Sequence, residues 1–286
     1  MAGKKAKTIS IKLAAIDIDG TLVNSEKKLT TAVKAAIKAA KQEQLKIVIC
    51  TGRPYTGVKS LLTELKLQNQ ADQYVICFGG ALVQTTNGHI INLQPLAYES
   101  FLKLEALASM QQLHFQAVAR KRIYTANRNI SCYTAYESII TQQEISYRTP
   151  AEMPKDDLIK AMIIDEKSKI DSLLQNWSAF APLEKEINFC RSSPNYIEAN
   201  ALGVNKGSAL QLLCHYLKLQ PAEVMAIGDQ GNDLSMLEYA GLAIAMGNAT
   251  AEVKAAAMFE TTDNDHDGVA QAIKQFCLNK VLGTAD

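Results

Sequence analysis

Two aspartates follow a short apolar segment near the start of the sequence. Residues 11–15 are mostly apolar and lead into Ile16-Asp17-Ile18-Asp19-Gly20-Thr21-Leu22. So short an apolar run predicts a strand buried on both faces, and open α/β sheets bind ligands where a parallel strand ends. Because side chains alternate along a strand, Asp17 and Asp19 should point to the same side. Repulsion between two carboxylates this close raises the pKa of one of them unless a positive charge neutralises them. A hard divalent cation, which prefers oxygen ligands, is the natural neutralising group.

Polar groups also follow two other predicted strands. The strand over residues 45–50 ends at Thr51-Gly52-Arg53-Pro54, and the strand over residues 224–227 ends at Gly228-Asp229-Gln230-Gly231-Asn232-Asp233. Lys206 lies between them in the sequence and begins a predicted helix. Parallel strands of one sheet point the same way, so these groups can meet at one edge. Each of these motifs, taken alone, is more typical of an ordinary turn, and Lys206, taken alone, is more typical of a solvated surface lysine. The order in which they occur, at the ends of predicted strands, favours a single shared site.

The elements that position these groups alternate between strands and helices. Thr30 is a suitable N-cap for an amphipathic helix over residues 30–43, and Pro54 suits the first turn of the next helix. A third strand covers residues 74–78, and residues 81–91 are expected to form a hairpin. After Lys206 the alternation returns and continues to a last helix that starts at Gly268. This pattern predicts an α/β fold whose core is a Rossmann-like, doubly wound parallel sheet.

Between the two halves of this core the pattern changes. Residues 101–113, 130–144 and 167–180 are predicted helices, and residues 115–119, 123–126, 158–164 and 187–191 are predicted strands. They indicate an inserted α+β domain with its own sheet, which we expect to be antiparallel. The predicted division is therefore 1–94 for the first part of the core, 95–194 for the insert and 195–286 for the second part of the core.

The composition is that of an ordinary globular protein. The chain has 286 residues, 48% hydrophobic and 21% charged, which suggests about two domains, and its net charge is +1. Nucleic acid and anionic membranes are therefore not indicated as partners. Six scattered cysteines without a C-x-x-C pair suggest free thiols in a reducing cytoplasm. The basic segment at residues 1–7 lacks a following apolar region, so it is not expected to be a signal peptide, and no membrane-spanning segment is predicted.

These motifs together resemble the haloacid dehalogenase superfamily of phosphatases. Its four ordered motifs correspond here to Asp17-Ile18-Asp19-Gly20-Thr21, Thr51-Gly52-Arg53, Lys206 and Gly228–Asp233. An insert between the second and third motifs is similar to the α/β cap, of the C2B kind, of the Cof-type subfamily. The resemblance covers nearly the whole chain, including Asp267-Gly268-Val269-Ala270. It implies that the insert is a mobile cap that closes over a substrate held by the core.

The resemblance also implies a role for each motif residue. Asp17 would be the nucleophile, and Asp19 the acid that protonates the leaving oxygen and later activates water. Mg²⁺ would be bound by the Asp17 side chain, the Asp19 backbone carbonyl and Asp229, while Asp233 would orient Lys206 or metal-bound water from outside the ligand set. The implied substrate-binding residues are Ile18, Thr51, Gly52, Arg53, Lys206 and Asn232.

Two positions depart from the family pattern, and neither is a charged residue. Gly79-Gly80 replaces the usual Asn-Gly after the third strand, and Ala199 replaces a larger aliphatic residue after Glu198. In the insert, Tyr124, Tyr133, Tyr136 and Tyr147 are expected to pack in the core of the cap, with a ring-stacking surface as the alternative.

The expected activity is Mg²⁺-dependent hydrolysis of a small phosphorylated metabolite, with a sugar phosphate as the leading class, through an aspartyl phosphate. Two alternatives remain at this point. One is a phosphomutase or phosphotransferase, which would return the phosphoryl group to a sugar. The other is a non-enzymatic sensor that is phosphorylated on Asp17. The expected partner is a small phosphorylated molecule, and the chain is expected to be a monomer or a weak homodimer.

Overall fold

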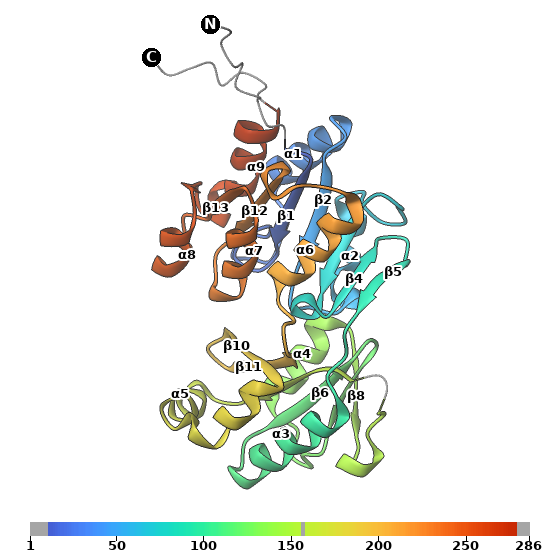
Figure 1. Ribbon diagram of the computed structural model, residues 1–286, viewed down its shortest axis with the longest axis vertical. Coiled ribbons are helices and arrows are strands. Elements are labelled where there is room, and N and C mark those ends of the chain that lie inside the picture. Colours follow the sequence, from blue (N-terminus) through green and yellow to red (C-terminus); the bar gives the residue numbers. More distant parts are fainter. Residues whose placement is uncertain (1–10, 156–157, 279–286) are drawn as a thin grey trace, which may run out of the picture.

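The computed structural model describes residues 11–155 and 158–278, so the basic segment at residues 1–7 lies outside the described residues. The part of the chain that it describes contains one eight-stranded and one six-stranded sheet. Figure 1 shows them as two bodies, with the core above and the inserted cap below. Among the described residues, no helix has both the length and the apolar character that crossing a membrane requires. All six cysteines are free thiols.

The core sheet has β1 near its centre. Its strand order is β14-β13-β12-β1-β2-β3-β4-β5. β1 pairs in parallel with both β12 and β2, so that Ile16 lies opposite Ile227 and Ile49. Within this described sheet only β4 runs opposite to the other strands: it pairs antiparallel with β3 and with β5, and β4 and β5 form the predicted hairpin. The strands are β1 (Leu13–Asp17), β2 (Lys46–Cys50), β3 (Tyr74–Cys77), β4 (Leu82–Thr85), β5 (Ile90–Leu93), β12 (Val224–Gly228), β13 (Leu242–Ala245) and β14 (Phe259–Glu260).

Helices cover both faces of the core sheet, which confirms the Rossmann-like prediction. Side chains of β1 alternate, so Leu13 and Ala15 pack with the helices of one face and Ala14 and Ile16 with those of the other. The first face carries α6 (Lys206–Leu217), α7 (Leu234–Tyr239) and α8 (Ala251–Ala256). The second carries α1 (Thr31–Gln42), α2 (Lys59–Glu64) and α9 (Gly268–Ile273). The apolar runs of the strands are therefore buried on both sides.

Local signals explain where the first helix begins. The Thr30 side chain accepts a hydrogen bond from the backbone N–H of Val33 at 3.2 Å, as an N-cap does. Val33, Ile37 and Ala40 face the sheet at helical spacing, and the lysines between them face outward. The helix carries the chain from the carboxyl end of β1 back to the start of β2. It thereby places the ends of β1 and β2 at the same edge of the sheet.

The cap sheet has the strand order β10-β11-β9-β6-β7-β8. Its strands are β6 (Phe115–Ala119), β7 (Arg122–Thr125), β8 (Glu144–Tyr147), β9 (Leu158–Ile164), β10 (Ile187–Ser193) and β11 (Tyr196–Ala201). Its helices are α3 (Tyr98–Met110), α4 (Cys132–Thr141) and α5 (Lys167–Gln175). The expectation of an antiparallel sheet is wrong at one place, because β7 and β8 are parallel.

Two cap strands, β8 and β11, are not predicted from the sequence. The predicted helix over 130–144 ends at Thr141, because Gln142 takes a left-handed conformation that stops the helix, and β8 follows. β11 pairs with both β10 and β9, so it belongs to the cap sheet. The boundary expected at residue 194 falls in the turn between β10 and β11. We therefore propose that the second part of the core begins after Ala201.

Candidate active site

Asp17, at the end of β1, is bonded to a buried lysine. Nζ of Lys206, the first residue of α6, lies 2.6 Å from Oδ1 of Asp17 and 2.6 Å from Oδ1 of Asp233. Lys206 is only 1% exposed. Burial alone would lower the pKa of Lys206, but the charges of Asp17 and Asp233 outweigh it and raise that pKa. The lysine is therefore a fixed positive charge at the edge of the sheet.

The turn after β12 is built around Asp233. Oδ2 of Asp233 accepts the backbone N–H groups of Asp229 at 3.0 Å and Gln230 at 3.1 Å. A Cβ atom at Gly228 would lie 2.5 Å from Cβ of Asp233, so only glycine leaves room for this turn. Because both carboxylate oxygens of Asp233 already have protein partners, Asp233 is suited to position Lys206 and the turn that carries Asp229.

Asp17, Asp229 and Asp233 form a buried acidic cluster. One carboxylate oxygen from each lies within 4.8 Å of the others. Burial raises the pKa of Asp17, and the charges of Asp233 and Asp229 raise it further against the opposing effect of Lys206. Burial and the charge of Asp233 raise the pKa of Asp229 to about 6. A divalent cation would relieve this repulsion, and oxygen donors are what Mg²⁺ prefers, so the cluster fits that ion.

Neighbouring residues hold Asp229 in place. The hydroxyl of Thr21 donates a hydrogen bond to Oδ1 of Asp229 at 2.9 Å. Gly20 has φ +85°, and a Cβ atom there would lie 2.4 Å from Oδ2 of Asp229. Gly20 therefore permits both the sharp turn of the chain after β1 and the close approach of the Asp229 side chain.

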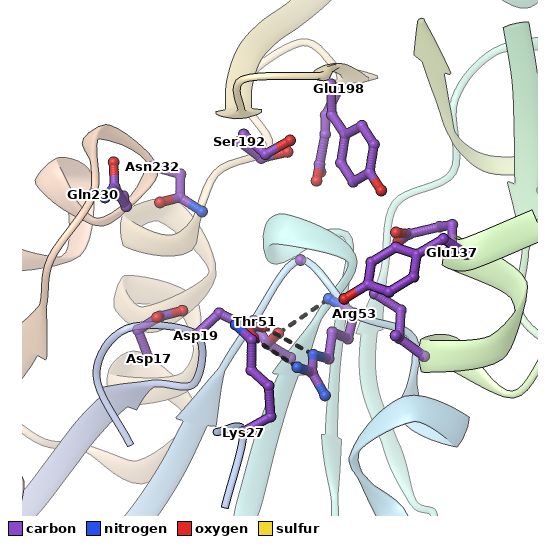
Figure 2. Close-up of a pocket in the computed structure, with 15 residues that line it drawn as sticks. Asp17, Asp19, Lys27, Thr51, Arg53, Glu137, Ser192, Glu198, Gln230 and Asn232 are labelled. Atoms are coloured by element: carbon purple, nitrogen blue, oxygen red, sulfur yellow. Dashed lines mark hydrogen bonds and ion pairs between the residues drawn. The ribbon is translucent and has the colours of Figure 1, made fainter. Parts of the chain in front are cut away.

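Asp19 does not join the acidic cluster. Arg53 donates to it from Nε at 2.9 Å and from Nη2 at 2.7 Å, and Lys27 donates from Nζ at 2.9 Å (Figure 2). Burial would raise the pKa of Asp19, but the hydrogen bonds and charges of Arg53 and then Lys27 outweigh it and lower that pKa. The expected repulsion between Asp17 and Asp19 is therefore wrong. The charges that raise the pKa of Asp17 are those of Asp233 and Asp229.

The loop after β2 is fixed by backbone hydrogen bonds. Thr51 donates its N–H to the carbonyl of Ile76 at 2.9 Å, and its own carbonyl accepts from Gly79 at 3.0 Å. Oγ1 of Thr51 accepts the N–H of Arg53 at 3.1 Å. A hydroxyl has one donor and two acceptor positions, so Thr51 keeps its O–H for a further acceptor.

A cavity of about 370 Å³ lies between the core and the cap. The core residues that line it are Asp17, Asp19, Lys27, Thr51, Gly52, Arg53, Gln230 and Asn232, and the cap residues are Tyr136, Glu137, Ile140, Ser192, Ser193, Tyr196 and Glu198. In Figure 2 the core aspartates lie below, Glu137 lies opposite Asn232, and Ser192 and Glu198 lie above. Six of the predicted core residues therefore line a space that cap residues also line.

Four predicted site residues lie outside this cavity lining, namely Ile18, Lys206, Asp229 and Asp233. The side chain of Ile18 is fully buried in the apolar core, so any contact with a substrate would be through its backbone. Lys206 is bonded to Asp17 and lines a neighbouring cavity of about 280 Å³ with Gly52 and Asn232. Asp229 is buried and lies in the acidic cluster with Asp17 and Asp233.

The cap residues of the cavity are not among the site residues predicted from the sequence. Glu137 and Tyr136 lie on α4 and Glu198 lies on β11, and no motif marked them. Tyr136 and Tyr147 are 52% and 42% exposed, so the expectation that they pack in the cap core is wrong for these two. In the sequence Glu198 precedes Ala199, a position that departs from the family pattern. That departure was the one feature of the sequence that could have pointed to Glu198.

Comparisons with known proteins agree on one family. A family model described as haloacid dehalogenase-like hydrolase matches residues 14–273. The presumed phosphatase YxeH of Bacillus subtilis (strain 168) is 41% identical over 271 residues, which cover 94% of this chain and 99% of that protein. The 5-amino-6-(5-phospho-D-ribitylamino)uracil phosphatase YcsE of the same organism is 31% identical over 270 residues, covering 94% of this chain and 97% of that protein.

The solved structures that resemble this fold include a phosphatase of the same superfamily. The subclass IIB sugar phosphatase BT4131 superposes with a TM-score of 0.79 at 26% sequence identity. The match covers 93% of this chain and 98% of that structure. The similarity therefore extends over both the core and the cap.

Proposed function

Because this chain belongs to the haloacid dehalogenase-like hydrolase family and is a phosphatase of that superfamily, we propose that it hydrolyses a small phosphorylated metabolite with the help of Mg²⁺. Sugar phosphates are the leading substrate class. The reducing cytoplasm is the proposed compartment, since all six cysteines are free. The arrangement that carries the proposal is Asp17 held by Lys206 beside Asp229, below a cavity that Thr51 and Asn232 line.

In the first displacement, a carboxylate oxygen of Asp17 attacks the phosphorus atom and the bond to the leaving oxygen breaks. Lys206 already binds Oδ1 of Asp17, so the second oxygen remains for the attack. Asp19 gives a proton to the leaving oxygen, which requires its contact with Arg53 to loosen. Thr51 and Asn232 hold phosphoryl oxygens, and most of what phosphoryl transfer needs from a protein is such positioning.

In the second displacement, Asp19 takes a proton from water, which attacks the phosphorus atom of the aspartyl phosphate. The bond between phosphorus and Asp17 breaks, inorganic phosphate leaves, and the carboxylate is restored. Asp17, Asp229 and the Asp19 backbone carbonyl would hold Mg²⁺, which supplies positive charge to the carboxylates and the phosphoryl oxygens. The cap above the cavity excludes bulk water during the first step.

The cap side of the cavity supports a leaving group with hydroxyl groups. Glu137 is 9% exposed, and the Tyr196 hydroxyl bonds to it. Glu137 and Glu198 offer carboxylate oxygens, which accept hydrogen bonds and repel a second acidic group. Lys160, a cap cation whose charge acts on Glu137, already pairs with Glu198. This chemistry suits a polyhydroxylated or amine-bearing leaving group better than a bisphosphate or a phosphorylated acid.

A panel of phosphorylated metabolites, assayed with the full chain and Mg²⁺ by release of inorganic phosphate, tests the proposal. We expect turnover of at least one sugar phosphate and loss of turnover by roughly 10³-fold or more in Asp17→Asn. Asp171→Asn, on α5 of the cap and not among the residues that line the cavity, is the matched control. Undiminished turnover in Asp17→Asn would refute the mechanism. A phosphorylated chain without phosphate release would favour the sensor, and transfer to a second sugar would favour a phosphomutase.

A further inference from the structure

Lys160 is a buried cap lysine that contacts the core. It lies on β9, is 2% exposed, and its Nζ donates to Oε2 of Glu198 at 2.7 Å and to the backbone carbonyl of Gly52 at 3.0 Å. Glu198 lies on the neighbouring strand β11, opposite Met162 of β9. Lys160 is two residues before Met162 on β9, so it is the diagonal neighbour of Glu198 on the same face of the cap sheet. A buried ammonium group needs such partners, and one of them belongs to the proposed phosphate-binding loop.

The bond to Gly52 fixes one peptide plane of that loop. In a planar trans peptide the Gly52 carbonyl and the Arg53 N–H point in opposite directions. The cap lysine therefore holds one edge of this plane, while the Arg53 N–H on the other edge donates to Oγ1 of Thr51 at 3.1 Å. That bond occupies an acceptor position of the Thr51 hydroxyl and leaves its hydrogen for a phosphoryl oxygen.

Glu198 keeps the lysine over the loop. Oε1 of Glu198 would lie 3.1 Å from a Cβ atom at Gly52, so the carboxylate packs directly against the glycine. Oε2 of the same carboxylate would lie 3.7 Å from a Cβ atom at Gly79, the position where the sequence departs from the family pattern. The two glycines therefore make room for a cap ion pair on the loop of the core.

We propose that Lys160 is a positioning residue that orients the Thr51 hydroxyl through the Gly52–Arg53 peptide, so that the phosphate-binding loop is complete only when the cap lies on the core. This inference rests on the proposed function, because it assigns the phosphoryl group to Thr51. Lys160 itself touches neither Asp17 nor the acidic cluster in any contact found among the described residues. Its effect should therefore pass through Thr51.

A double-mutant cycle on the full chain tests this route. Lys160→Met combined with Glu198→Gln removes the ion pair without leaving a buried charge, and it is made in the wild-type and Thr51→Val backgrounds. The readout is the Kd of inorganic phosphate with Mg²⁺, measured by calorimetry, together with kcat and KM for an aryl phosphate. Lys103→Met with Glu186→Gln removes a cap ion pair of 2.6 Å whose side chains bond to each other and to Ser100 of the cap, and it is the matched control.

We expect the Lys160 and Glu198 substitutions to weaken phosphate binding by roughly tenfold in the wild-type background, the value of one hydrogen bond. In the Thr51→Val background they should change the Kd by less than about twofold, because the hydroxyl that they orient is gone. The control pair should change nothing. An equal loss in both backgrounds would overturn the proposal.

A second variant keeps the test valid if the combined substitution does not fold. Lys160→Arg retains the ion pair but changes the position of the donor, and the same comparison between backgrounds applies to it. The binding of inorganic phosphate is measured without turnover. The proposed function and the positioning role of Lys160 can therefore be refuted independently of each other. A wild-type chain that hydrolyses no phosphomonoester refutes the proposed function. Binding in which Lys160 and Thr51 act independently refutes only the positioning role.

Discussion

Nζ of Lys206 lies 2.6 Å from Oδ1 of Asp17, although 189 residues separate the two in sequence. The contact joins the end of β1 to the start of α6, and the entire cap is inserted between them. It brings the first and third motifs together at one edge of the core sheet. Removing Lys206 leaves two buried carboxylates, Asp17 and Asp233, without the cation that they share.

Lys206→Met should therefore reduce both stability and activity. It leaves Asp17 and Asp233 as neighbouring buried carboxylates, so we expect a loss of about 3–5 kcal/mol in the free energy of unfolding. Turnover should fall by roughly 10²- to 10³-fold, because a fixed charge at the transferring group is lost. Urea unfolding and phosphate release measure the two effects. Lys254→Met breaks the more exposed pair with Glu260 and should cost no more than about 1 kcal/mol, without loss of turnover.

The stabilising effect of Mg²⁺ should depend on pH through Asp229. Its pKa rises from 3.8 to about 6 in the folded chain, first by burial and then by the charge of Asp233. The folded state therefore binds this proton more tightly. Without metal, the resulting stability is fully present below about pH 4 and is lost as the pH rises towards about 6, by at most about 3 kcal/mol.

Mg²⁺ binds the ionised carboxylate, so the increase in Tm that it causes should be larger at about pH 7.5 than at about pH 5. Thermal unfolding with Mg²⁺ or with EDTA at both pH values measures this difference. Asp229→Asn carries no titrating carboxyl group at this position, so the part of the pH dependence due to residue 229 should disappear. The same pH dependence in wild type and variant would contradict the assignment.

Gly20→Ala should weaken metal binding more than it weakens the fold. The new Cβ atom would lie 2.4 Å from Oδ2 of Asp229, which must move. Gly88→Ala is the matched control, because Gly88 has φ +95° and no heavy atom of the described residues lies within 4 Å of its Cβ position. Both changes cost about 1–2 kcal/mol in the left-handed region. Only Gly20→Ala should raise the Kd of Mg²⁺, by roughly ten- to hundredfold, as measured by thermal shift titration.

Glu137→Gln should change substrate preference. If the carboxylate accepts hydroxyl groups of the leaving group, kcat/KM for sugar phosphates should fall roughly ten- to hundredfold, the cost of a hydrogen bond to a charged group. An aryl phosphate has no such hydroxyl groups, so its kcat/KM should stay within about twofold. Glu144→Gln, at an exposed cap carboxylate that pairs with Arg122, should affect neither substrate. Equal losses for both substrates would show that Glu137 has only a structural role.

Arg53→Met should shift the pH dependence of turnover. Burial favours a higher pKa for Asp19, and the hydrogen bonds and charge of Arg53 are the largest effects that lower it. Without Arg53 that pKa rises, so Asp19 stays protonated to higher pH and can still donate a proton there. The limb of the kcat/KM profile that falls with increasing pH should move to higher pH. Lys27→Met removes the weaker partner and should move it less; a larger shift in Lys27→Met would contradict this ranking.

Local patterns in the sequence were enough to predict the core. Apolar runs such as the one before Asp17 must be buried on both faces, and the N-cap at Thr30 needs only its own helix. The order of the strand-end motifs then predicted one site, and the structure brings Asp17, Lys206, Asp229 and Asp233 together there. These inferences hold because strand period and turn chemistry are properties of neighbouring residues.

Only the tertiary structure decided which charges face one another. Asp17 and Asp19 are two residues apart, yet Asp19 turns to Arg53 while Asp17 meets Asp229 and Asp233. The parallel pairing of β8, the place of β11 and the contact from Lys160 to Gly52 depend on how distant segments pack. The sequence by itself thus determined the elements of the core and the chemistry at their ends. The partners of each charged group depended on distances between segments that no local pattern encodes.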